Sequence, residues 1–569
     1  MSEELARPLP PVTPETEFFW ASGADGKLRM QECLNCSALI NPPQPVCRHC
    51  RSTAMGVRVL SGQATLAGFT VNHRFRIPGK PPPYVIAQVA IVEDSRVRMT
   101  TNIVADFAPE QLELGMLLEV EFEQTEDENI WLPVFRPAAE QPTPPSRAPQ
   151  APDEIPLDRI GEYVRPMLSQ EKFEDKVALT GIGMSQVGRR LMRAPLSLTV
   201  EACEAAVADA GLTLDDIDGL STYPGMGGFG GFSEGGVTGL ASALGLRPTW
   251  FNGAMETFGP SGPLVAAMFA VASGFARHVL CYRTLWESTH TELVRQGKVA
   301  ALVADDPLRP YGPEAQQWFI PFGLVSAAQT IAQIAGRYFQ RYGTSREETL
   351  GWIALNQRAN AALHPTAIYR EPLTMADYLE ARMITTPLGL YDCDVPCDGA
   401  VAIIVSHVDA ARDLAKPPVL VEAVGTQLIE RLEWDQSTLT HEPLTFGQAA
   451  HMWSRTSLRP KDVDLAELYD GFTMNCLSWI EALGFCGIGE GKDFLAGGHN
   501  IARDGVLPLN THGGQLSHGR THGMGLVHEA VTQLRGEAGE RQIPDARVGA
   551  VSCGGVTPSI AMLLRADSR

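Results

Sequence analysis

The chain has 569 residues, with 66 acidic and 46 basic side chains, and its formal net charge is -20 at pH 7. This length exceeds one ordinary hydrophobic core, and a hydrophobic content of 44% excludes a mostly disordered chain. The acidic balance argues against broad binding to nucleic acid, but it permits one local basic pocket for a phosphorylated cofactor.

The sequence also carries signals about location. It has no apolar run of about 18 residues, and its first residues lack the cationic tip and apolar core of a secretory signal. We therefore expect neither a signal peptide nor membrane insertion, and a cytoplasmic location. Seven of the eleven cysteines are scattered along the chain, unlike a secreted disulfide framework, which agrees with that compartment.

The first 60 residues predict a short amphipathic helix, over residues 16–27, that leads into a metal site. Two C-x-x-C pairs follow within 18 residues, and their members are Cys33, Cys36, Cys47 and Cys50. Four thiolates at this spacing are typical of a zinc ribbon, whose closed tetrahedral site is structural rather than catalytic. We expect Zn²⁺ here; an empty or degenerate ribbon is the alternative.

Residues 61–138 have the pattern of a small antiparallel barrel. After Gly62 the segments ATLAGFTVNHRF, YVIAQVAIVED, VRMTTNIVA and LLEVEFEQT alternate β-branched and polar residues between Gly, Pro and Asp turns. The stretch from Pro137 to Pro156 has a proline every few residues and predicts a stiff linker, assigned to residues 139–174.

The remaining body contains an internal duplication at a constant offset of 246 residues. Leu198, Thr199, Leu212, Asp216, Asp218 and Tyr223 recur as Leu444, Thr445, Leu458, Asp462, Asp464 and Tyr469. Each copy reads as a helix, a turn with two aspartates and a short buried strand. The repeat predicts an α/β body of two similar halves, the alternative being chance agreement of helix-cap residues.

These features resemble two known families. The ribbon and the segments GQATLAGFTVNHRF and PPPYVIAQVAIVED resemble a zinc-ribbon/OB-fold accessory family, the domain of unknown function number thirty-five, over residues 15–138. Members of that family accompany thiolase-like proteins that act on acyl-CoA. The body resembles the thiolase superfamily, in its sterol-carrier or lipid-transfer branch, over about residues 175–567.

The resemblance implies an α/β thiolase fold with duplicated αβαβα layers, behind a zinc ribbon and an all-β OB-fold. Its two halves correspond to residues 175–299 and 417–569, and residues 300–416 form a loop domain and the return to the core. It also implies a homodimer formed through the body.

Two thiolase landmarks in the sequence are altered. In the segment ETFGPSG, Gly259 stands where the family has its nucleophilic cysteine, so covalent thioester chemistry through this position is excluded. The family's Asn-Glu-x-Phe motif reads YDGF here, so that Tyr469 replaces the asparagine and Asp470 follows it.

A third landmark is also altered, and a fourth survives. Arg520 occupies the position of the activating histidine in the family's Gly-His-Pro loop, although His518 and His522 flank it. The Cys-x-Gly motif near the C-terminus is retained at residues 553–555. This combination resembles the thiolase-like retro-aldolases of steroid side-chain degradation, which also pair with the ribbon/OB module.

The resemblance implies retro-aldol cleavage of a β-hydroxyacyl-CoA, here a steroid side-chain CoA ester. The products would be a ketosteroid, or an aldehyde, and propionyl-CoA or acetyl-CoA, and the N-terminal module would help close the CoA or steroid channel. Two alternatives stay open: an acyltransferase with another nucleophile such as Cys553, and a non-catalytic lipid or acyl-CoA carrier.

Such a cleavage needs a base, a stabiliser of the thioester enolate and an acid. We expect Tyr469 to take or relay the hydroxyl proton, with Asp470 orienting it, although a neighbouring carboxylate opposes ionisation of the phenol. Candidates for the enolate site are the backbone N–H groups of Cys553, Gly554 and Gly555 with His522 or His518, and Cys553 is also the candidate acid.

Each candidate also has a structural interpretation. Tyr469 is a core phenol if it merely repeats Tyr223, and Cys553 is then a small buried hydrophobe. Arg520 binds a CoA phosphate or forms an internal ion pair. Tyr369 and Tyr391 are further phenols in a stretch that lines the family's substrate pocket, or they serve core packing. Trp318, Phe319, Pro321 and Phe322 suit a polycyclic substrate or a dimer surface.

Overall fold

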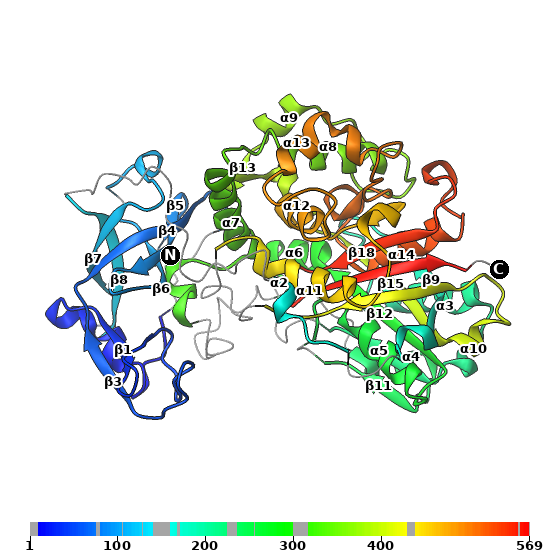
Figure 1. The fold of residues 1–569 in the computed structure, drawn as a ribbon, viewed down its shortest axis with the longest axis horizontal. Helices are drawn as coiled ribbons and strands as arrows, with labels where there is room; N and C mark the ends of the chain where they lie inside the picture. Colours follow the sequence, from blue (N-terminus) through cyan, green and yellow to red (C-terminus); the bar gives the residue numbers. More distant parts are fainter. Residues whose placement is uncertain are drawn as a thin grey trace.

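The computed structural model describes residues 9–75, 80–104, 106–127, 129–139, 160–167, 171–224, 236–254, 257–299, 317–429, 439–555 and 558–567. The N-terminal module forms one lobe and the α/β body forms the other, as Figure 1 shows. The proline-rich linker predicted for residues 139–174 falls mostly on residues 140–159, which lie outside this description. No helix within the described ranges is long and apolar enough to cross a membrane.

The N-terminal module begins with a small three-stranded sheet, ordered β2-β1-β3. Its strands are β1 (Arg29–Cys33), β2 (Leu39–Ile40) and β3 (Met55–Val59). The helix predicted over residues 16–27 is only α1 (Glu17–Trp20), followed by a 3-10 turn, η1 (Ser22–Asp25). The turn stops at Gly26, whose left-handed φ of 70° suits glycine.

The predicted antiparallel barrel is present. Its strands are β4 (Gln63–Asn72), β5 (Tyr84–Ile91), β6 (Asp94–Asn102), β7 (Leu117–Gln124) and β8 (Trp131–Pro137), with η2 (Pro109–Gln111) before β7. Strand β4 pairs with both β5 and β7, and β8 pairs with β7. A bridge between Ile103 and Phe135 closes the barrel, as an OB-fold requires.

The body is built on a nine-stranded sheet with the order β11-β10-β12-β15-β9-β16-β19-β18-β17. Its strands are β9 (Val177–Met184), β10 (Gly219–Thr222), β11 (Trp250–Asn252), β12 (His278–Trp286), β15 (Asp398–His407), β16 (Val419–Gly425), β17 (Leu465–Glu467), β18 (Val548–Cys553) and β19 (Ile560–Ala566). The two halves meet where β9 pairs with β16.

The duplication predicted from the sequence is present. Helix α3 (Pro195–Ala210), turn η5 (Leu214–Asp216) and strand β10 in the first half correspond to α11 (Glu442–Trp453), η9 (Pro460–Asp462) and β17 in the second. The second aspartate of each copy makes the same contact. The carboxylate of Asp218 accepts the first backbone N–H of β12, and the carboxylate of Asp464 accepts the first backbone N–H of β18. Such shared detail excludes chance agreement.

Helices pack on the strands of each half. In the first half, α3 contacts β9, β12 and β15, and α5 (Gly262–Ala272) contacts β10, β12 and β15. In the second half, α11 contacts β16 and β19, and α14 (Met524–Leu534) contacts β17, β18 and β19. The other helices of these parts are α2 (Ile160–Tyr163), α4 (Gly236–Leu244), α6 (Glu287–Arg295), α10 (Val408–Ala411), α12 (Thr473–Ala482) and α13 (Gly491–Leu495).

The loop domain contains η7 (Ile320–Phe322), α7 (Ala327–Tyr342), α8 (Leu350–Ala361), α9 (Met375–Glu380), β13 (Met383–Thr385), β14 (Leu388–Gly389) and η8 (Leu390–Asp392). In Figure 1, α7 and β13 of the loop domain lie between the two lobes, whereas α8 and α9 lie at the top of the body. Short turns elsewhere are η4 (Glu174–Lys176), η10 (Ala496–Ile501), the π-type turn η11 (Gly514–His518) and η12 (Gly539–Arg541).

The loop domain holds the N-terminal module. Strand β13 extends the barrel sheet by pairing with β4, and Trp318 stacks on Trp20 with ring centroids 4.9 Å apart. Trp318 and Phe322 are buried in the same core as the ribbon/OB side chains, so the expected roles in substrate contact or a dimer surface are wrong for both. Phe319 packs beside Tyr84 of the barrel. The small module thus completes its core with aromatic rings from the loop domain.

We expect Trp318→Ala to loosen this attachment. Trp318 is only 5% exposed and contacts both Trp20 and Phe19. Replacing a buried tryptophan with alanine typically lowers the free energy of unfolding by roughly 3–5 kcal/mol. Denaturant unfolding should show the N-terminal module melting earlier, in a separate transition from the body. Phe275→Ala, at an exposed surface ring, is the control, and an unchanged unfolding curve for Trp318→Ala would contradict the assignment.

Candidate active site

The carboxyl ends of two neighbouring strands bring Tyr469 and Cys553 together. Strands β17 and β18 run parallel, with Glu467 opposite Val551. Strand β17 ends two residues before Tyr469, and Cys553 is the last residue of β18. The backbone N–H of Tyr469 donates to Ser552 Oγ at 2.9 Å, one residue before Cys553. This edge of an open sheet is where α/β proteins place their ligand sites.

Tyr469 is a buried phenol in this group. Its side chain is almost fully enclosed, and burial raises its pKa above the ordinary value, while the positive charge of Arg520 acts in the opposite direction. The phenol is therefore protonated at neutral pH, which suits a hydrogen-bond donor or a relay better than a base.

Asp470 is fully buried beside it. One carboxylate oxygen, Oδ1, accepts the backbone N–H of Gln515 at 2.8 Å. Burial raises the pKa of Asp470 to about 6, and that hydrogen bond partly offsets the rise. Gly514 approaches Oδ2 so closely that a side chain at position 514 would collide with the carboxylate. Asp470 is thus locked between its neighbours rather than open to a ligand.

Arg520 forms an internal ion pair, one of the two roles considered for it. Its Nη1 lies 3.0 Å from Glu287 Oε2, and its Nε lies 3.1 Å from Asp394 Oδ2. Its backbone N–H donates to the carbonyl of Val395, which fixes the loop beside Asp394. The position of the family's activating histidine therefore holds a guanidinium shared by two carboxylates.

His522 adopts one defined neutral form. Its Nδ1 lies 3.1 Å from Nη2 of Arg283. A guanidinium can only donate hydrogen bonds, so Nδ1 accepts and the ring proton sits on Nε2. Burial and the charges of Arg283 and Arg520 also lower the pKa of His522 well below its usual value. His522 is therefore a neutral N–H donor at physiological pH.

His518 lies in a different environment. Its ring packs against His364, with centroids 4.5 Å apart, and against His512 at 5.2 Å. Burial and the neighbouring histidines lower its pKa well below the usual value. The structure thus places His518 in a buried histidine cluster, whereas His522 lies beside Arg283.

The Cys553 region explains the missing nucleophile. The Cys553 thiol donates to the carbonyl of Gly523 at 3.4 Å, and burial raises the pKa of the thiol to about 12. At the expected nucleophile position, Gly259 has a φ of 74°, and a Cβ there would lie 2.3 Å from the carbonyl oxygen of Pro558. Any side chain at position 259 would therefore require the backbone to move. The Cys553 thiol, for its part, is protonated at neutral pH.

The next two glycines hold their peptide groups in place. The carbonyl of Gly554 accepts from Trp479 Nε1 at 2.9 Å, and the carbonyl of Gly555 accepts from Asn475 Nδ2 at 2.8 Å. These bonds to buried side chains fix the orientation of the loop that follows β18. A preorganised loop is what an oxyanion site of backbone N–H groups needs.

Tyr369 and Tyr391 share one cation. The guanidinium of Arg358 lies 5.0 Å from the ring centroid of Tyr369 and 5.2 Å from that of Tyr391. The hydroxyl of Tyr369 accepts from Arg189 at 3.4 Å. Both rings are half-buried, so they combine packing with partial exposure.

Three side chains of this group escaped the sequence analysis. They are Asp394, Glu287 and Arg283, which contact the predicted residues Arg520 and His522. Asp394 lies in the segment GLYDCDVPCDGA, where an acidic residue between two cysteines was the available signal. Its role depends on a contact with residue 520, which the sequence pattern does not reveal.

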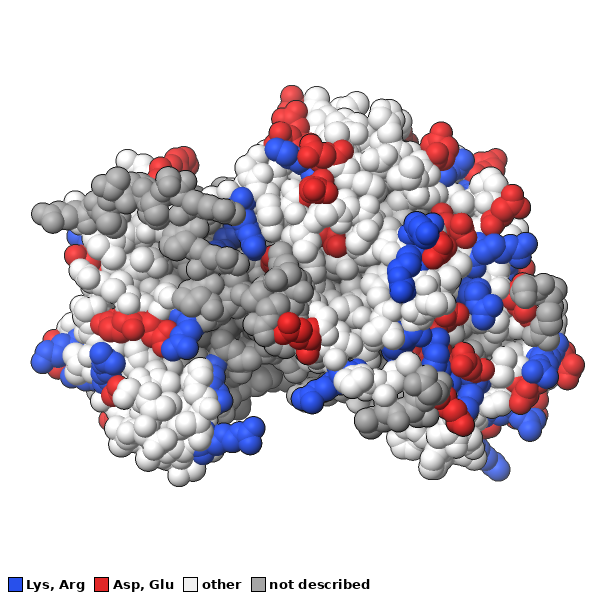
Figure 2. Space-filling model, viewed as in Figure 1, with Lys and Arg blue, Asp and Glu red and all other residues white. Residues whose placement is uncertain are grey.

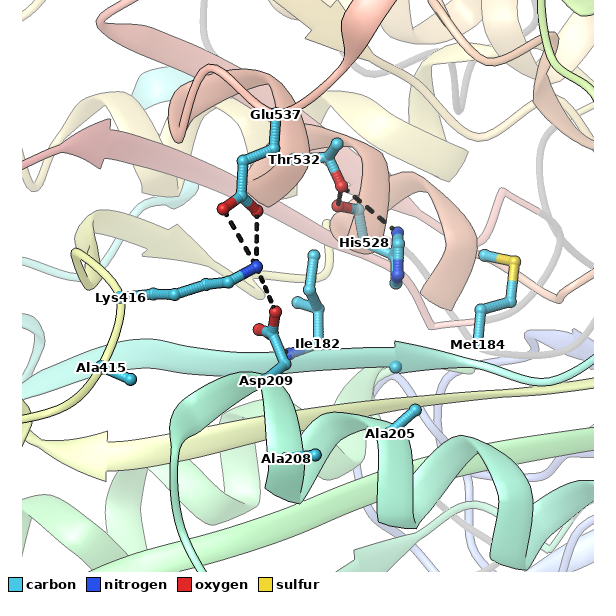
Figure 3. Close-up of a pocket in the computed structure, with 11 residues that line it drawn as sticks. Ile182, Met184, Ala205, Ala208, Asp209, Ala415, Lys416, His528, Thr532 and Glu537 are labelled. Atoms are coloured by element: carbon cyan, nitrogen blue, oxygen red, sulfur yellow. Dashed lines mark hydrogen bonds and ion pairs between the residues drawn. The ribbon is translucent and has the colours of Figure 1, made fainter.

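A separate cleft opens between α3 and α14 (Figure 3), and none of its lining residues is a predicted site residue. Lys416 crosses it, with Nζ 2.6 Å from Asp209 Oδ1 and 3.0 Å from Glu537 Oε1. This cation is neutralised by two carboxylates, so the cleft does not offer the free positive charge that a phosphate needs.

Figure 2 shows how charged side chains are distributed over one face of the molecule. On the face shown in Figure 2, the described Lys and Arg side chains are interspersed with Asp and Glu, and the middle of that face is largely uncharged. A backbone-binding protein would instead gather its basic residues in a stripe or patch.

The four cysteines of the ribbon fit a tetrahedral metal site. Their Sγ atoms all lie within 4.8 Å of one another, with 3.5 Å between Cys33 and Cys50 and 3.6 Å between Cys36 and Cys47. Four thiolates at about 2.3 Å from Zn²⁺ would be about 3.8 Å apart. Bound zinc would hold the two C-x-x-C segments together and leave no position for a catalytic water.

Comparisons with known proteins place these features in a family. Residues 20–56 match the ChsH2 rubredoxin-like zinc ribbon domain, residues 57–123 the ChsH2 C-terminal OB-fold domain and residues 435–564 the thiolase C-terminal domain-like family. A steroid side-chain-cleaving aldolase of Thermomonospora curvata is 35% identical over 410 residues, covering 68% of this chain and 98% of that protein. The chain belongs to the thiolase superfamily.

Two further relatives of this thiolase-superfamily chain are informative. A 17-hydroxy-3-oxo-4-pregnene-20-carboxyl-CoA lyase of Mycobacterium tuberculosis is 36% identical over 373 residues, covering 63% of this chain and 92% of that protein. A solved structure, an Ltp2-ChsH2(DUF35) aldolase, superposes with a TM-score of 0.60 and 32% identity, covering 69% of this chain and 98% of that chain. The thiolase fold with an N-terminal ribbon and OB-fold is therefore confirmed.

Proposed function

We propose that this chain is a carbon–carbon lyase that cleaves a β-hydroxyacyl-CoA thioester by a retro-aldol reaction. The substrate is a steroid side-chain CoA ester, and the products are a ketosteroid, or an aldehyde, and propionyl-CoA or acetyl-CoA. The observation that carries the proposal is Gly259, where the backbone leaves no room for the thiolase nucleophile. Retro-aldol cleavage needs no acyl-enzyme, and the aldolase and lyase relatives support the same reaction class.

The residues can be assigned to steps on their contacts. We propose that Tyr469 relays the proton of the β-hydroxyl, with Asp470 fixed beside it through Gln515. His522, an N–H donor through Nε2, joins the backbone N–H groups of residues 553–555 at the enolate oxygen. We favour His522 over His518, because His518 is enclosed by other histidines. The protonated Cys553 supplies the proton that the enolate carbon needs.

Substrate binding is assigned to the surroundings of this group. We propose that Tyr369, Tyr391 and the loop of Gly554 and Gly555 line the acyl-CoA site, which the N-terminal module helps to close. Arg520 contributes to this site by holding Glu287 and Asp394 in ion pairs. Its other role considered from the sequence, a direct contact with a CoA phosphate, stays a prediction.

Two further proposals concern assembly and location. We propose a homodimer through the body, supported by the edge strand β11, whose Phe251 is 64% exposed next to an unshared sheet edge. We also propose a cytoplasmic location, because a four-thiolate zinc site and seven further thiols are the cysteine chemistry of a reducing compartment.

Mass spectrometry of a defined substrate tests the reaction. The purified chain is incubated with a 17-hydroxysteroid that carries a propionyl-CoA side chain, and we expect a 17-ketosteroid and intact propionyl-CoA. Release of free CoA would instead indicate acyl transfer, since a retro-aldol step leaves the thioester whole. Tight binding without turnover would indicate a carrier, and either result would overturn the proposed reaction.

A further inference from the structure

The proposed reaction lacks a base among the residues predicted from the sequence. Burial raises the pKa values of Tyr469 and Cys553, so both are protonated at neutral pH. His522 accepts from Arg283 through Nδ1, its one basic nitrogen, and His518 is enclosed in the histidine cluster. Asp470 is locked by Gln515 and Gly514 and has no exposed surface. A further group must take the proton.

The ion-pair cluster at Arg520 contains one negative charge too many. A single guanidinium pairs with two carboxylates, at 3.0 Å from Glu287 Oε2 and 3.1 Å from Asp394 Oδ2. The cluster is poorly hydrated, since the Arg520 and Glu287 side chains are 22% and 23% exposed and Asp394 is 11% exposed. The negative charge of Glu287 therefore disfavours ionisation of Asp394, the less exposed of the two carboxylates.

We propose that Asp394, held on Arg520, is the general base of the carbon–carbon cleavage. This inference rests on the proposed function and deepens it by naming the group that accepts the β-hydroxyl proton. Asp394 is the better placed of the two carboxylates, because its backbone N–H donates to the carbonyl of Gly471 at 3.1 Å, which ties it to the Tyr469 segment.

The charges around Asp394 are consistent with this role. Burial raises the pKa of Asp394 to about 7, Arg520 lowers it, and the negative charges of Glu287 and Asp470 raise it further. The groups that face Asp394 from the neighbouring elements are Arg520, Glu287, Asp470, Tyr469, Cys393 and Cys397. Arg520 supplies the one positive charge among these groups. Asp394 is therefore a carboxylate that titrates near neutral pH, as suits a general base.

The proton balance closes without another reactant. The β-hydroxyl O–H bond breaks, and its proton moves to a carboxylate oxygen of Asp394, directly or through Tyr469. The oxygen lone pair forms the new C=O bond, the Cα–Cβ bond breaks, and its electron pair becomes the thioester enolate. The enolate carbon takes the proton of Cys553, and the proton on Asp394 then restores the thiol, so the enzyme ends unchanged.

Substitutions in the full-length protein test the assignment. We expect Asp394→Asn to lower kcat at least about a hundredfold, the usual contribution of a general base, while the affinity for the acyl-CoA product is retained. Asp394→Glu should recover part of the activity. Asp409→Asn, at an exposed carboxylate on α10, is the matched control and should cleave like the wild type. An Asp394→Asn variant with more than a tenth of wild-type kcat would overturn the proposal.

Glu287→Gln separates a base from a structural residue. The negative charge of Glu287 raises the pKa of Asp394, so its removal should move the acid limb of the kcat–pH profile to lower pH. A limb that stays in place would show that Asp394 is not the titrating group. If the wild type cleaves no acyl-CoA, the proposed function itself fails; infrared difference spectra between pH 5 and pH 9 then still show whether a carboxylic acid band is lost in Asp394→Asn.

Discussion

Tyr469→Phe should reduce the retro-aldol cleavage rate about 10²- to 10⁴-fold, the usual effect of losing a group that transfers a proton in the transition state. The substitution removes one hydroxyl from a ring that is 6% exposed and whose backbone is fixed on Ser552. The ring keeps its packing, so the fold and the affinity for acyl-CoA should change little. Single-turnover formation of the ketosteroid, followed by mass spectrometry, measures the effect.

A second phenol provides the control for this prediction. Tyr342 is a half-buried tyrosine of α7 that packs on Tyr338 and His441. Tyr342→Phe also removes one hydroxyl, and it should leave the cleavage rate within a factor of two. Nearly full activity in Tyr469→Phe would show that Tyr469 only packs in the core, and the relay would have to pass through another group.

Much of the fold could be predicted because its signals are local or repeated. Cysteine spacing indicated the ribbon, strand alternation indicated the barrel, and a constant offset revealed the two halves. The constant offset is visible in the sequence because Asp218 and Asp464 make the same contact with the start of a following strand. Both copies therefore keep the same residue at the same spacing. The domain boundaries drawn from these signals stay predictions.

The attachment of the N-terminal module was not predictable from such signals. Trp318 and Trp20 are almost 300 residues apart, and their stacking depends on how the loop domain packs against the barrel. An aromatic stretch alone is equally compatible with a ligand pocket, an oligomer surface or an internal interface. Only the buried contact with the ribbon side chains distinguishes these possibilities.

The sequence supplied candidates for the site residues, which stay predictions, but it did not reveal the surroundings that set their chemistry. Tyr469, Arg520 and Cys553 were named from family landmarks, and the pairing of β17 with β18 shows why two of them lie together. Besides burial, protonation in this site depends on partners from other elements of the fold. Arg283 lowers the pKa of His522, whereas Arg520 and Asp394 act in opposite directions on the pKa of Tyr469. The sequence left two roles open for Tyr469, to take the hydroxyl proton or to relay it, and the burial that raises its pKa favours the relay.

Removal of zinc should unfold the ribbon while the body stays folded. The cluster that the ribbon forms by itself has three buried side chains, Cys33, Ile40 and Cys47, and two of them are metal ligands. Met30 and Leu39 of the ribbon strands are buried in the barrel core instead. So small a cluster cannot offset the loss of chain entropy, and binding of a structural zinc typically supplies about 10–16 kcal/mol. We expect one zinc per chain by elemental analysis, and rapid hydrogen exchange over residues 29–59 after chelation.

The same result should follow from a single ligand change. Cys36→Ser should lose the metal and expose β1, β2 and β3 to exchange, whereas Cys486→Ser, at a half-buried thiol of the body, should keep both. The nine-stranded sheet should stay protected in both variants, because its large core is separate from the ribbon core. Persistent protection of residues 29–59 without metal would mean that the ribbon is held by its contacts with the barrel, and zinc would then be dispensable for its fold.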